Sequence, residues 1–418
     1  MGIVPTNKLK PGLILAEEAR DANGRLILAK GKRIQSFHIK KFKIWGITEV
    51  NISADTALKD ELQLDDNSEA IERTKERLKY IFSHNDLEHP AVKEIFRLSL
   101  DYRSRHNSLA KEEKVIANQK KPIPKNRRVD FLEILNKTKI KLPEIPSIVA
   151  ELNEVIANPL SSAQDIANVV NNSPALTATL LKVVNSALYS CPSKIDKLSQ
   201  AVTLIGTKEI YGLALYISVI SIFRKIPKEI INMYDFLRHS IACSITARIL
   251  AAHKNLPQTE QLFVSGLLHD LGRVLLFIYF PEDSLNILSY SRDSDKLLFE
   301  VENEYLGCNH TDFGKHLMQH WNLPPTLENN IFYHHNPSAA QHKIPATIVH
   351  LADIIVNAFG IGSSGEQFVP PLDYEAWDDL GLAISVFEVA AKQAIHQLNS
   401  LICLVVLPWS YQTFRERP

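Results

Sequence analysis

The sequence predicts a multidomain chain: a small N-terminal β-rich (α+β) domain at residues 1–58, a charged helical connector and linker at 59–129, and an all-α helical domain at 130–418 that includes a C-terminal extension. Three observations lead to this fold class. The chain has 418 residues, too many for one ordinary core. Its first 53 residues hold short apolar runs around an Asn-Gly turn. From Leu142 onward the pattern is almost all helical.

The N-terminal domain is predicted from a hairpin signal. Two apolar runs, residues 13–16 and 26–28, flank residues 21–24, which contain Asn23-Gly24. Both residues of an Asn-Gly pair tolerate positive φ, so the pair favours a tight β-turn. A short helix at 35–45 is expected to end at Gly46, which can take the left-handed cap, and a strand at 49–52 would close the sheet.

The connector contains two amphipathic segments, residues 69–82 and 91–102, each with a narrow apolar face. Such faces suit docking on the main domain or self-association. Residues 119–128 follow, and their prolines and basic charge are typical of a solvated linker.

In the helical domain, capping residues predict where helices begin. Ser161-Ser162, followed by Gln164-Asp165, offers one N-cap, and Ser173 before Pro174 offers another. Thr207 is expected to cap the helix that follows it. Residues 165–170, a short turn and residues 175–184 also resemble a DNA-reading helix-turn-helix, a remote alternative. That second helix carries one basic residue, Lys182, and is otherwise rich in Leu and Val, so burial is favoured over DNA binding.

The overall composition narrows the functional classes. With 47 basic and 47 acidic side chains the formal net charge is +0, which gives no general attraction to nucleic acid or anionic membranes. The four cysteines have no Cys-x-x-Cys spacing, and a reducing cytoplasm fits them. The N-terminus has no apolar signal core, and the apolar run at 401–407 is shorter than the ~20 residues of a spanning helix. We therefore expect a cytoplasmic protein with no membrane contact.

The most informative feature is His269-Asp270, because an imidazole beside a carboxylate can provide adjacent ligands to one divalent metal. Other candidate ligands flank it at separations of tens of residues: His239, His310, His334, His335 and Asp353. Nitrogen and oxygen ligands without a thiolate suit iron, manganese or zinc. Five histidines and two aspartates are enough for two metals that share a bridging carboxylate and a water.

The alternative for any single histidine is a packed or solvated side chain. The chain has 15 histidines, and eight are assigned this structural role. They are His84, His106, His253, His316, His320, His342, His350 and His396.

Several motifs in order resemble the HDOD branch, the HD-related output domains of bacterial signalling proteins, within the HD superfamily of metal-dependent phosphohydrolases. The resemblance runs from about residue 140 to about residue 359. The motifs are Leu142-Pro143-Glu144-Ile145-Pro146, residues 180–187, residues 201–206, Arg238-His239-Ser240, residues 266–272, His334-His335-Asn336-Pro337 and residues 349–353. The resemblance implies an all-α domain of HD type.

The resemblance to the related HD-GYP phosphodiesterases, which open cyclic di-GMP, implies a ligand set. It consists of His239, His269, Asp270, His310, His334, His335 and Asp353. Two departures from the HD-GYP pattern stand out. Arg273 occupies the place of a lysine and can hold phosphate as a two-pronged donor, and the Gly-Tyr-Pro loop after the histidine pair is missing. Asp235 lies one turn before His239, where an extra acidic ligand can occur, although a solvated aspartate is the alternative.

Two functions share this predicted fold. As a regulatory or binding output module, the domain would contact other signalling proteins or a nucleotide ligand, with self-association also open. As a metal-dependent phosphohydrolase or phosphodiesterase, it would act on a nucleotide or cyclic dinucleotide through a metal-bound water, with no side chain as nucleophile. The resemblance favours the module, whereas the intact ligand set favours the enzyme.

Overall fold

The structure is a computed structural model. It describes residues 2–53 with gaps at 7–8, 10–11, 21–25, 36–37, 40–41, 43–46 and 48; residues 70–106; and residues 143–405 with gaps at 187–188, 190, 192, 224–225 and 228. The chain divides into two compact units, Met1–Glu76 and Arg77–Pro418, and each is described by itself. The predicted turn at 21–24, the Gly46 cap and the linker at 119–128 lie outside the described residues.

The N-terminal unit contains two small antiparallel sheets. Strand β1 (Gly2–Pro5) pairs with β4 (Glu49–Ile52), and β2 (Ala19–Arg20) pairs with β3 (Leu26–Leu28). Residues 13–16 supply only isolated bridges, Ile14 to Arg33 and Leu15 to Ile52, in place of the regular strand that we expected. The predicted strand at 49–52 is present as β4, but such short strands support a β-rich domain only weakly.

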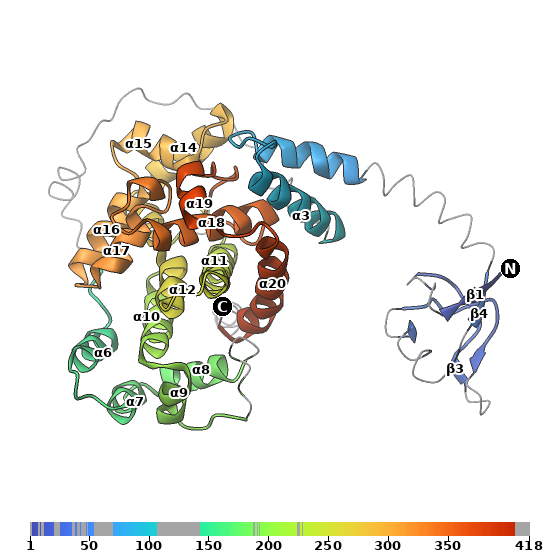
Figure 1. Cartoon of the computed structure of the whole chain (residues 1–418), viewed down its shortest axis with the longest axis horizontal. Helices are drawn as coiled ribbons and strands as arrows, with labels where there is room; N and C mark the ends of the chain where they lie inside the picture. The colour runs from blue at the N-terminus through green and yellow to red at the C-terminus, as the bar shows by residue number, and fades with distance from the viewer. Residues whose placement is uncertain are drawn as a thin grey trace, which may run out of the picture. The chain divides into compact units, whose positions relative to one another are not determined.

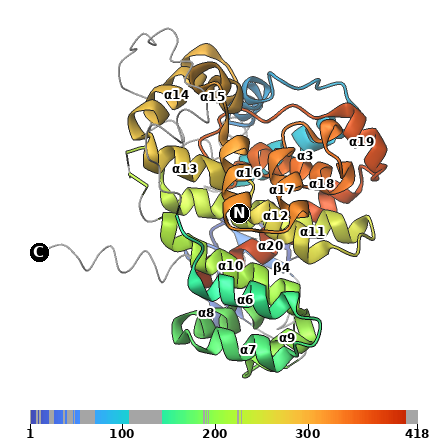
Figure 2. The same ribbon diagram turned by 90° about the vertical axis from the view of Figure 1, so that its left-hand side faces the viewer.

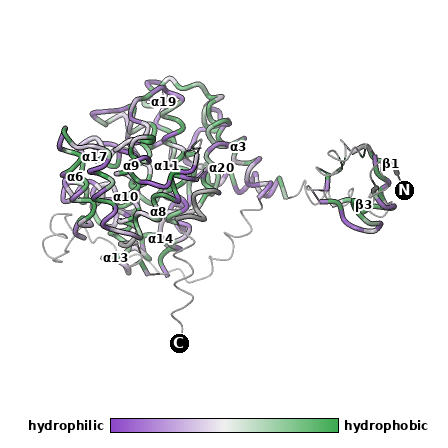
Figure 3. The backbone as a smooth tube through the Cα atoms, turned by 90° about the horizontal axis from the view of Figure 1, so that it is seen from below, coloured by the Kyte–Doolittle hydropathy of each residue, from purple (hydrophilic) through white to green (hydrophobic). Residues whose placement is uncertain are grey.

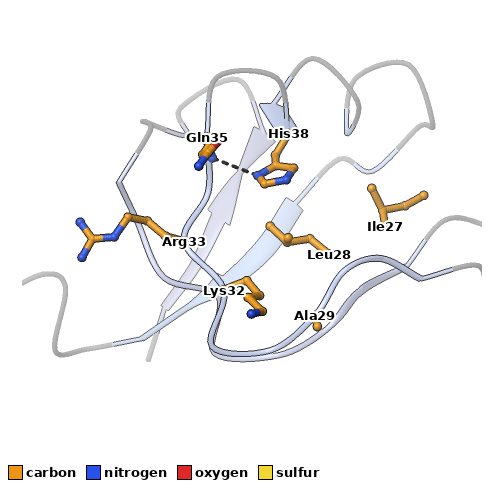
Figure 4. A pocket seen from close by; sticks show the side chains of 7 residues that line it. All are labelled: Ile27, Leu28, Ala29, Lys32, Arg33, Gln35 and His38. Carbon is orange, nitrogen blue, oxygen red and sulfur yellow. Dashed lines mark hydrogen bonds between the residues drawn. The ribbon is translucent and has the colours of Figure 1, made fainter. Parts of the chain in front are cut away.

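A small core holds the N-terminal unit together. Leu15, Ile34 and Phe42 are fully buried in it and are joined by Val50 and Ile52 of β4. One face of this unit carries an open pocket, drawn in Figure 4. Its lining includes Lys32, Arg33 and His38, whose Nδ1 accepts a hydrogen bond from the Gln35 amide (Figure 4). None of the predicted metal ligands lines this pocket.

The second unit is helical, as expected. Residues 70–81, which cross the boundary between the units, are also helical. The helices up to the middle of the chain are α3 (Pro90–His106), α6 (Ser147–Ala157), α7 (Ala163–Asn171), α8 (Pro174–Val184), α9 (Leu198–Ile205), α10 (Thr207–Phe223) and α11 (Met233–His253). Those that follow are α12 (Thr259–Leu268), α13 (Leu271–Tyr279), α14 (Pro281–Ser294), α15 (Leu298–Leu306), α16 (His310–His320), α17 (Pro325–Phe332), the 3-10 helix η3 (Pro337–Ala339), α18 (Lys343–Phe359), α19 (Tyr374–Leu380) and α20 (Val386–Val405).

Two of the predicted caps are confirmed. The Ser162 side chain accepts from the Asp165 amide in a capping box at α7. Ser173 caps α8, whose first residue is Pro174. Thr207 is the first helical residue of α10 and does not occupy the preceding cap position that we expected, which is Gly206. Helix α8 corresponds to the second helix of the helix-turn-helix alternative. Its buried residues are Leu176, Leu180, Val183 and Val184. That burial disfavours a DNA-reading role for α8.

Helix α11 lies at the centre of this unit. Fourteen of its 21 residues are buried, and it packs chiefly against α12, α18 and α20. In Figures 1 and 2, α6 to α9 lie at one end of the unit and α14 and α15 at the other, with α10, α11 and α12 between them. Along the helices hydrophobic and hydrophilic segments alternate (Figure 3). A helix buried all round can hold polar side chains only where they find partners.

Part of the connector packs onto this core. Val92 and Ile95 of α3 belong to the same buried cluster as the central helices. Arg103 of α3 is 3% exposed, and its guanidinium donates to the carbonyls of Asn357 and Ala358 at 2.9 and 2.8 Å. These carbonyls belong to the last turn of α18, where the Gly360 amide also donates to the Asn357 carbonyl at 3.0 Å. The sequence left docking on the main domain and self-association as alternatives, and α3 docks on the main domain.

Two stretches of the described chain are apolar enough to be tested as membrane spans. Residues 259–279 have a mean hydropathy of 1.5, but 89% of that window is buried inside the protein. The second, Leu198–Ile205 with Thr207–Val219, is bent by 119°. The core helix of a globular domain has the same length and composition, so these stretches are weak evidence for a span.

Two glycines allow the close helix contacts around the centre. A Cβ on Gly266 of α12 would lie 2.8 Å from the Cys243 carbonyl oxygen of α11. A Cβ on Gly272 of α13 would lie 1.9 Å from the His310 carbonyl oxygen and 2.5 Å from the Gly314 nitrogen of α16. No side chain fits at these separations, so glycine lets α12 meet α11 and α13 meet α16.

We predict that Gly272→Ala lowers the free energy of unfolding by at least about 1–3 kcal/mol, because α13 and α16 must separate to admit the methyl group. Gly314→Ala is the matched control on the same interface. Its Cβ would meet the Ile331 Cγ2 methyl group at 3.0 Å and the Gly272 nitrogen at an ordinary contact distance of 3.8 Å. The gain of about 1 kcal/mol in helix propensity offsets this contact. Thermal and urea unfolding measure both variants; equal stabilities would contradict the close contact.

Candidate metal centre

Five segments of the helical unit bring the predicted residues together. His239 projects from the second turn of α11, and Asp353 lies in the middle of α18. His269 and Asp270 occupy the break between α12 and α13. His310 is the first residue of α16, where Asn309 and Asp312 form a capping box. His334 and His335 lie in the turn after α17.

The first group of ligand atoms, hereafter group 1, consists of His239, His269 and Asp353. The His239 Nε2 atom lies 3.1 Å from Asp353 Oδ1 and 3.4 Å from His269 Nε2. His269 Nε2 lies 3.5 Å from the same Asp353 oxygen. All three side chains are buried. One cation between these three atoms would be close to each of them.

The second group, group 2, consists of His310, His334 and His335. His310 Nε2 lies 3.2 Å from His335 Nε2 and 3.5 Å from His334 Nε2. His310 and His334 are fully buried, whereas His335 is half-buried, and its ring stacks on Phe299 with centroids 4.4 Å apart. Group 2 therefore reaches toward the surface at His335.

Asp270 lies between the two groups. Its Oδ2 is 3.2 Å from His269 Nε2 and 3.6 Å from His239 Nε2 in group 1. Its Oδ1 is 3.2 Å from His310 Nε2 in group 2. One carboxylate thus presents a separate oxygen to each group, which is the arrangement of a bridging ligand between two metals.

Hydrogen bonds at the far side of two rings determine which of their nitrogens face the centre. The Nδ1 atoms of His269 and His334 lie 2.8 and 2.7 Å from the carbonyl oxygens of Gly266 and Ile331. A carbonyl can only accept, so each Nδ1 carries the proton and donates it. The Nε2 atoms of neutral rings therefore point lone pairs into the cluster. Metal-binding histidines are oriented in this way.

The centre fits a cation because several ligand atoms face one another at short range, and the neighbouring donors do not reach all of them. Lone pairs of several Nε2 atoms converge, and Asp270 Oδ1 is buried with no hydrogen-bond partner. A buried acceptor without a donor is costly. A divalent cation would satisfy these atoms at once, so the donor set and its geometry fit one metal at each group.

The carboxylates hold negative charge even though they are buried. Burial opposes ionisation of Asp270, but Arg273 and His269 outweigh it and lower its pKa well below the usual range. Burial likewise opposes ionisation of Asp353, whose pKa is lowered by its contacts with His239 and His269. For His269, burial disfavours the charged ring, but Asp270 and Asp353 raise its pKa to about 10. Without a metal, a proton on His269 compensates part of this charge.

The remaining histidine pair stays neutral. Burial and the nearby rings of His269 and His310 lower the pKa of His334 to about 3. Burial and its neighbours His334 and His310 lower the pKa of His335 well below the ordinary value. Neutral imidazole is the form that binds metals, so His334 and His335 need no deprotonation to act as ligands.

Arg273 is buried in this network with 2% of its surface exposed. Its guanidinium contacts Glu302 Oε1 at 3.1 Å, Asp270 Oδ2 at 3.2 Å and Ser364 Oγ at 2.8 Å. Its Nη2 lies 3.0 Å from His310 Nδ1. Arg273 is therefore a partner of the Glu302 and Asp270 carboxylates. A role in binding phosphate stays a prediction and would require some of these contacts to be exchanged.

Asp235 is not part of the cluster. It is half-buried in the first turn of α11, and its backbone carbonyl accepts from the Ser363 amide at 3.0 Å. It belongs to none of the groups of neighbouring ligand atoms among the described residues. Its assignment as an extra ligand stays a prediction.

Sequence reasoning missed two residues of this centre. Glu302 of α15 lies with Oε2 2.6 Å from His310 Nδ1 and accepts from the His310 amide at 2.9 Å. The Sγ atom of Cys243 lies 3.5 Å from His239 Nε2. A sulfur atom thus lies beside the nitrogen and oxygen ligands that we expected. The spacing of four residues from His239 on one helix could have indicated Cys243, but no local pattern marks Glu302.

His350 bears out its assigned structural role. Its Nδ1 donates to the His334 carbonyl at 2.7 Å, and its Nε2 accepts from the Asp373 amide at 3.0 Å. Both ring nitrogens are occupied, so His350 supports the turn that carries His334.

Comparisons with known proteins agree with this architecture. An uncharacterized protein of Treponema pallidum (strain Nichols) is 25% identical over 211 residues, which cover 49% of this chain and 40% of that protein. The crystal structure of an HDOD domain protein of unknown function from Geobacter sulfurreducens has 20% identity and a TM-score of 0.56, covering 66% of this chain and 98% of that one. A protein from Shewanella amazonensis SB2B, provisionally named a phosphohydrolase, has 22% identity and a TM-score of 0.51, covering 65% and 97%.

The two structural likenesses show a shared fold. The family model of the HDOD domain matches residues 142–337, which include His239, His269, Asp270 and the group 2 histidines. Asp353 lies beyond the matched segment, on α18. Residues 142–337 of the chain are therefore similar to the HDOD domain.

Proposed function

We propose that this chain is a bacterial signal-transduction protein of the cytoplasm whose HDOD domain is a regulatory output module built around one or two divalent metal ions. Groups 1 and 2 would hold the metals, with Asp270 between them. Iron, manganese and zinc are the candidates, since the ligands are mostly imidazole and carboxylate. Bound cations would cancel the charges of Asp270 and Asp353 and tie α11, α16 and α18 to the α12–α13 break.

The enclosure of the ligands carries this proposal. Asp353 is 4% and Asp270 3% exposed, and four of the five histidines are fully buried. A catalytic metal must keep a coordination position open to substrate, whereas a structural or regulatory metal need not. Enclosed ligands therefore favour a module that uses the metal to set its shape. Its partners would be other signalling proteins or a nucleotide ligand.

A second candidate is a metal-dependent phosphohydrolase acting on a nucleotide or cyclic dinucleotide. The observation that favours it is Asp270, whose two oxygens face different histidine groups as a bridging carboxylate does in two-metal hydrolases. His335 is half-buried and marks the side from which a phosphoester would approach. Metals at such a centre would supply Lewis acidity and lower the pKa of a water.

We predict roughly one to two iron, manganese or zinc ions per chain in protein purified without chelator. Asp270→Ala should lose most of this metal, because nothing else separates the charges of two adjacent cations. His320→Ala is the control, since His320 is an exposed residue of α16. Elemental analysis by plasma mass spectrometry gives the stoichiometry. Folded protein that carries no metal after growth with added metals would refute the assignment.

A screen of phosphoesters separates the two functions. We expect cyclic di-GMP turnover to be absent or weak, since the Gly-Tyr-Pro loop is missing, and any activity to fall on another phosphoester. Metal-loaded protein is incubated with cyclic dinucleotides and nucleotides, and products are resolved by chromatography. His269→Ala, with His320→Ala as control, shows whether turnover depends on the centre. Robust metal-dependent opening of cyclic di-GMP would move the protein into the phosphodiesterases.

The negative charge of Glu302 should stabilise His310 of group 2 and the neighbouring Arg273. Burial opposes its ionisation, but His310 and Arg273 outweigh burial and keep its pKa below the ordinary 4.5. We predict that Glu302→Gln lowers the free energy of unfolding of metal-free protein by roughly 3–5 kcal/mol at neutral pH, since Arg273 loses a buried partner. A group with a lowered pKa stabilises the fold above its ordinary pKa, so the difference from wild type should shrink as pH falls below 4.5.

The matched control for Glu302→Gln is Glu304→Gln, two residues along the chain. Glu304 pairs with Lys296 at 2.5 Å, with side chains 49% and 37% exposed. Loss of such a surface pair changes stability by less than about 1 kcal/mol. Urea unfolding at several pH values compares the two variants. Metal titration of Glu302→Gln should also show affinity reduced by about 10–100-fold. Equal effects of the two substitutions would contradict the proposed network.

A further inference from the structure

Cys243 is a buried thiol aimed into the metal centre. It lies one helical turn after His239 on α11, so both side chains occupy the same helix face. Its side chain is fully buried. The Sγ atom is 3.5 Å from His239 Nε2 and 4.0 Å from Asp353 Oδ1. One ligand atom from each of His239, Cys243, His269 and Asp353 can be chosen so that all four lie within 4.8 Å of one another.

Four of the six separations among these atoms are close to the edges of a coordination tetrahedron. Typical zinc distances, ~2.3 Å to sulfur and ~2.0–2.1 Å to nitrogen or oxygen, give tetrahedral edges of about 3.5 Å from sulfur and about 3.4 Å between the lighter atoms. The observed sulfur edge to His239 is 3.5 Å, and the other three edges in group 1 are 3.1, 3.4 and 3.5 Å. The sulfur edge to Asp353, at 4.0 Å, is slightly long. A small rotation of the Cys243 side chain would close it.

We propose that Cys243 is a thiolate ligand of the metal at group 1, which makes group 1 a Cys-His-His-Asp site suited to zinc or another thiophilic divalent ion. This inference rests on the metal centre proposed above and adds a ligand to it. On binding, the thiol proton is released to solvent and the sulfur joins the metal. The thiolate and Asp353 together carry two negative charges, which balance one divalent cation.

The two groups would then differ in metal preference. Thiolate is a soft ligand that favours zinc, cobalt and iron over manganese or magnesium, whereas group 2 offers only imidazoles and the Asp270 carboxylate. A sulfur ligand also fills a position that a catalytic centre would leave to water or substrate. Group 1 would therefore be the tighter, structural site of the pair as long as Asp270, whose Oδ2 lies 3.2 Å from His269 Nε2, separates the two cations.

The test uses cobalt(II), because a thiolate bound to cobalt gives a near-ultraviolet charge-transfer absorption that nitrogen and oxygen ligands do not. The full chain, stripped with chelator, is titrated with cobalt(II). Wild type should show this absorption, and Cys243→Ser should lose it and bind cobalt or zinc at group 1 at least ~10-fold more weakly. Cys308→Ser is the matched control, because Cys308 is also buried but is not among the neighbouring ligand atoms.

The outcomes separate this inference from the proposed function. Cobalt that binds with visible absorption of a low-symmetry site but without the thiolate band would overturn the role of Cys243 and leave the metal centre in place. No cobalt binding at all would overturn the metal centre itself. If Cys243→Ser does not fold, X-ray absorption of zinc-loaded wild type decides: a sulfur neighbour at ~2.3 Å supports the inference, and a shell of nitrogen and oxygen alone refutes it.

Discussion

The burial of two carboxylates, Asp270 and Asp353, is the constraint on which the centre of this protein depends. An unpaired buried carboxylate is penalised by several kcal/mol, so its neighbours must supply positive charge or donors. Here they are imidazoles and the Arg273 guanidinium, which itself needs Glu302. Asn357 adds a donor to Asp353 at 2.8 Å. Removing any one of these side chains leaves a buried charge without its partner. The network is therefore cooperative and suited to respond to a bound cation.

The helices are arranged so that this charge network can form. Gly266 and Gly272 let α12 approach α11 and let α13 approach α16, and the chain changes direction between them at His269 and Asp270. The HDOD segment therefore positions the ligands through backbone contacts as well as through side chains. A metal bound there would link elements far apart in sequence, from α11 to α18, and its loss or gain would alter how firmly they hold together. That coupling is a physical basis for an output module.

Features that depend on neighbouring residues in the chain could be predicted from the sequence. Capping residues Ser162 and Ser173-Pro174 located helices because a cap satisfies amides within three residues. The seven candidate ligands were named from motif order, and the structure places them in one buried cluster. Contacts between segments far apart in the sequence could not be predicted from local patterns. Examples are the contacts of Arg273 with Glu302 and Ser364 and that of Glu302 with His310. The strand expected at 13–16 formed only bridges, since pairing depends on partners elsewhere in the chain.

Anomalous scattering from crystals grown with zinc, measured at the zinc absorption edge, tests the metal centre most directly. We predict two peaks inside the helical unit. One should lie among His239, His269 and Asp353 and the other among His310, His334 and His335, with Asp270 between them and a separation of roughly 3.5–4 Å. A single peak would restrict the centre to one metal. Peaks confined to surface residues, with none in the cluster, would contradict the assignment of these side chains as ligands.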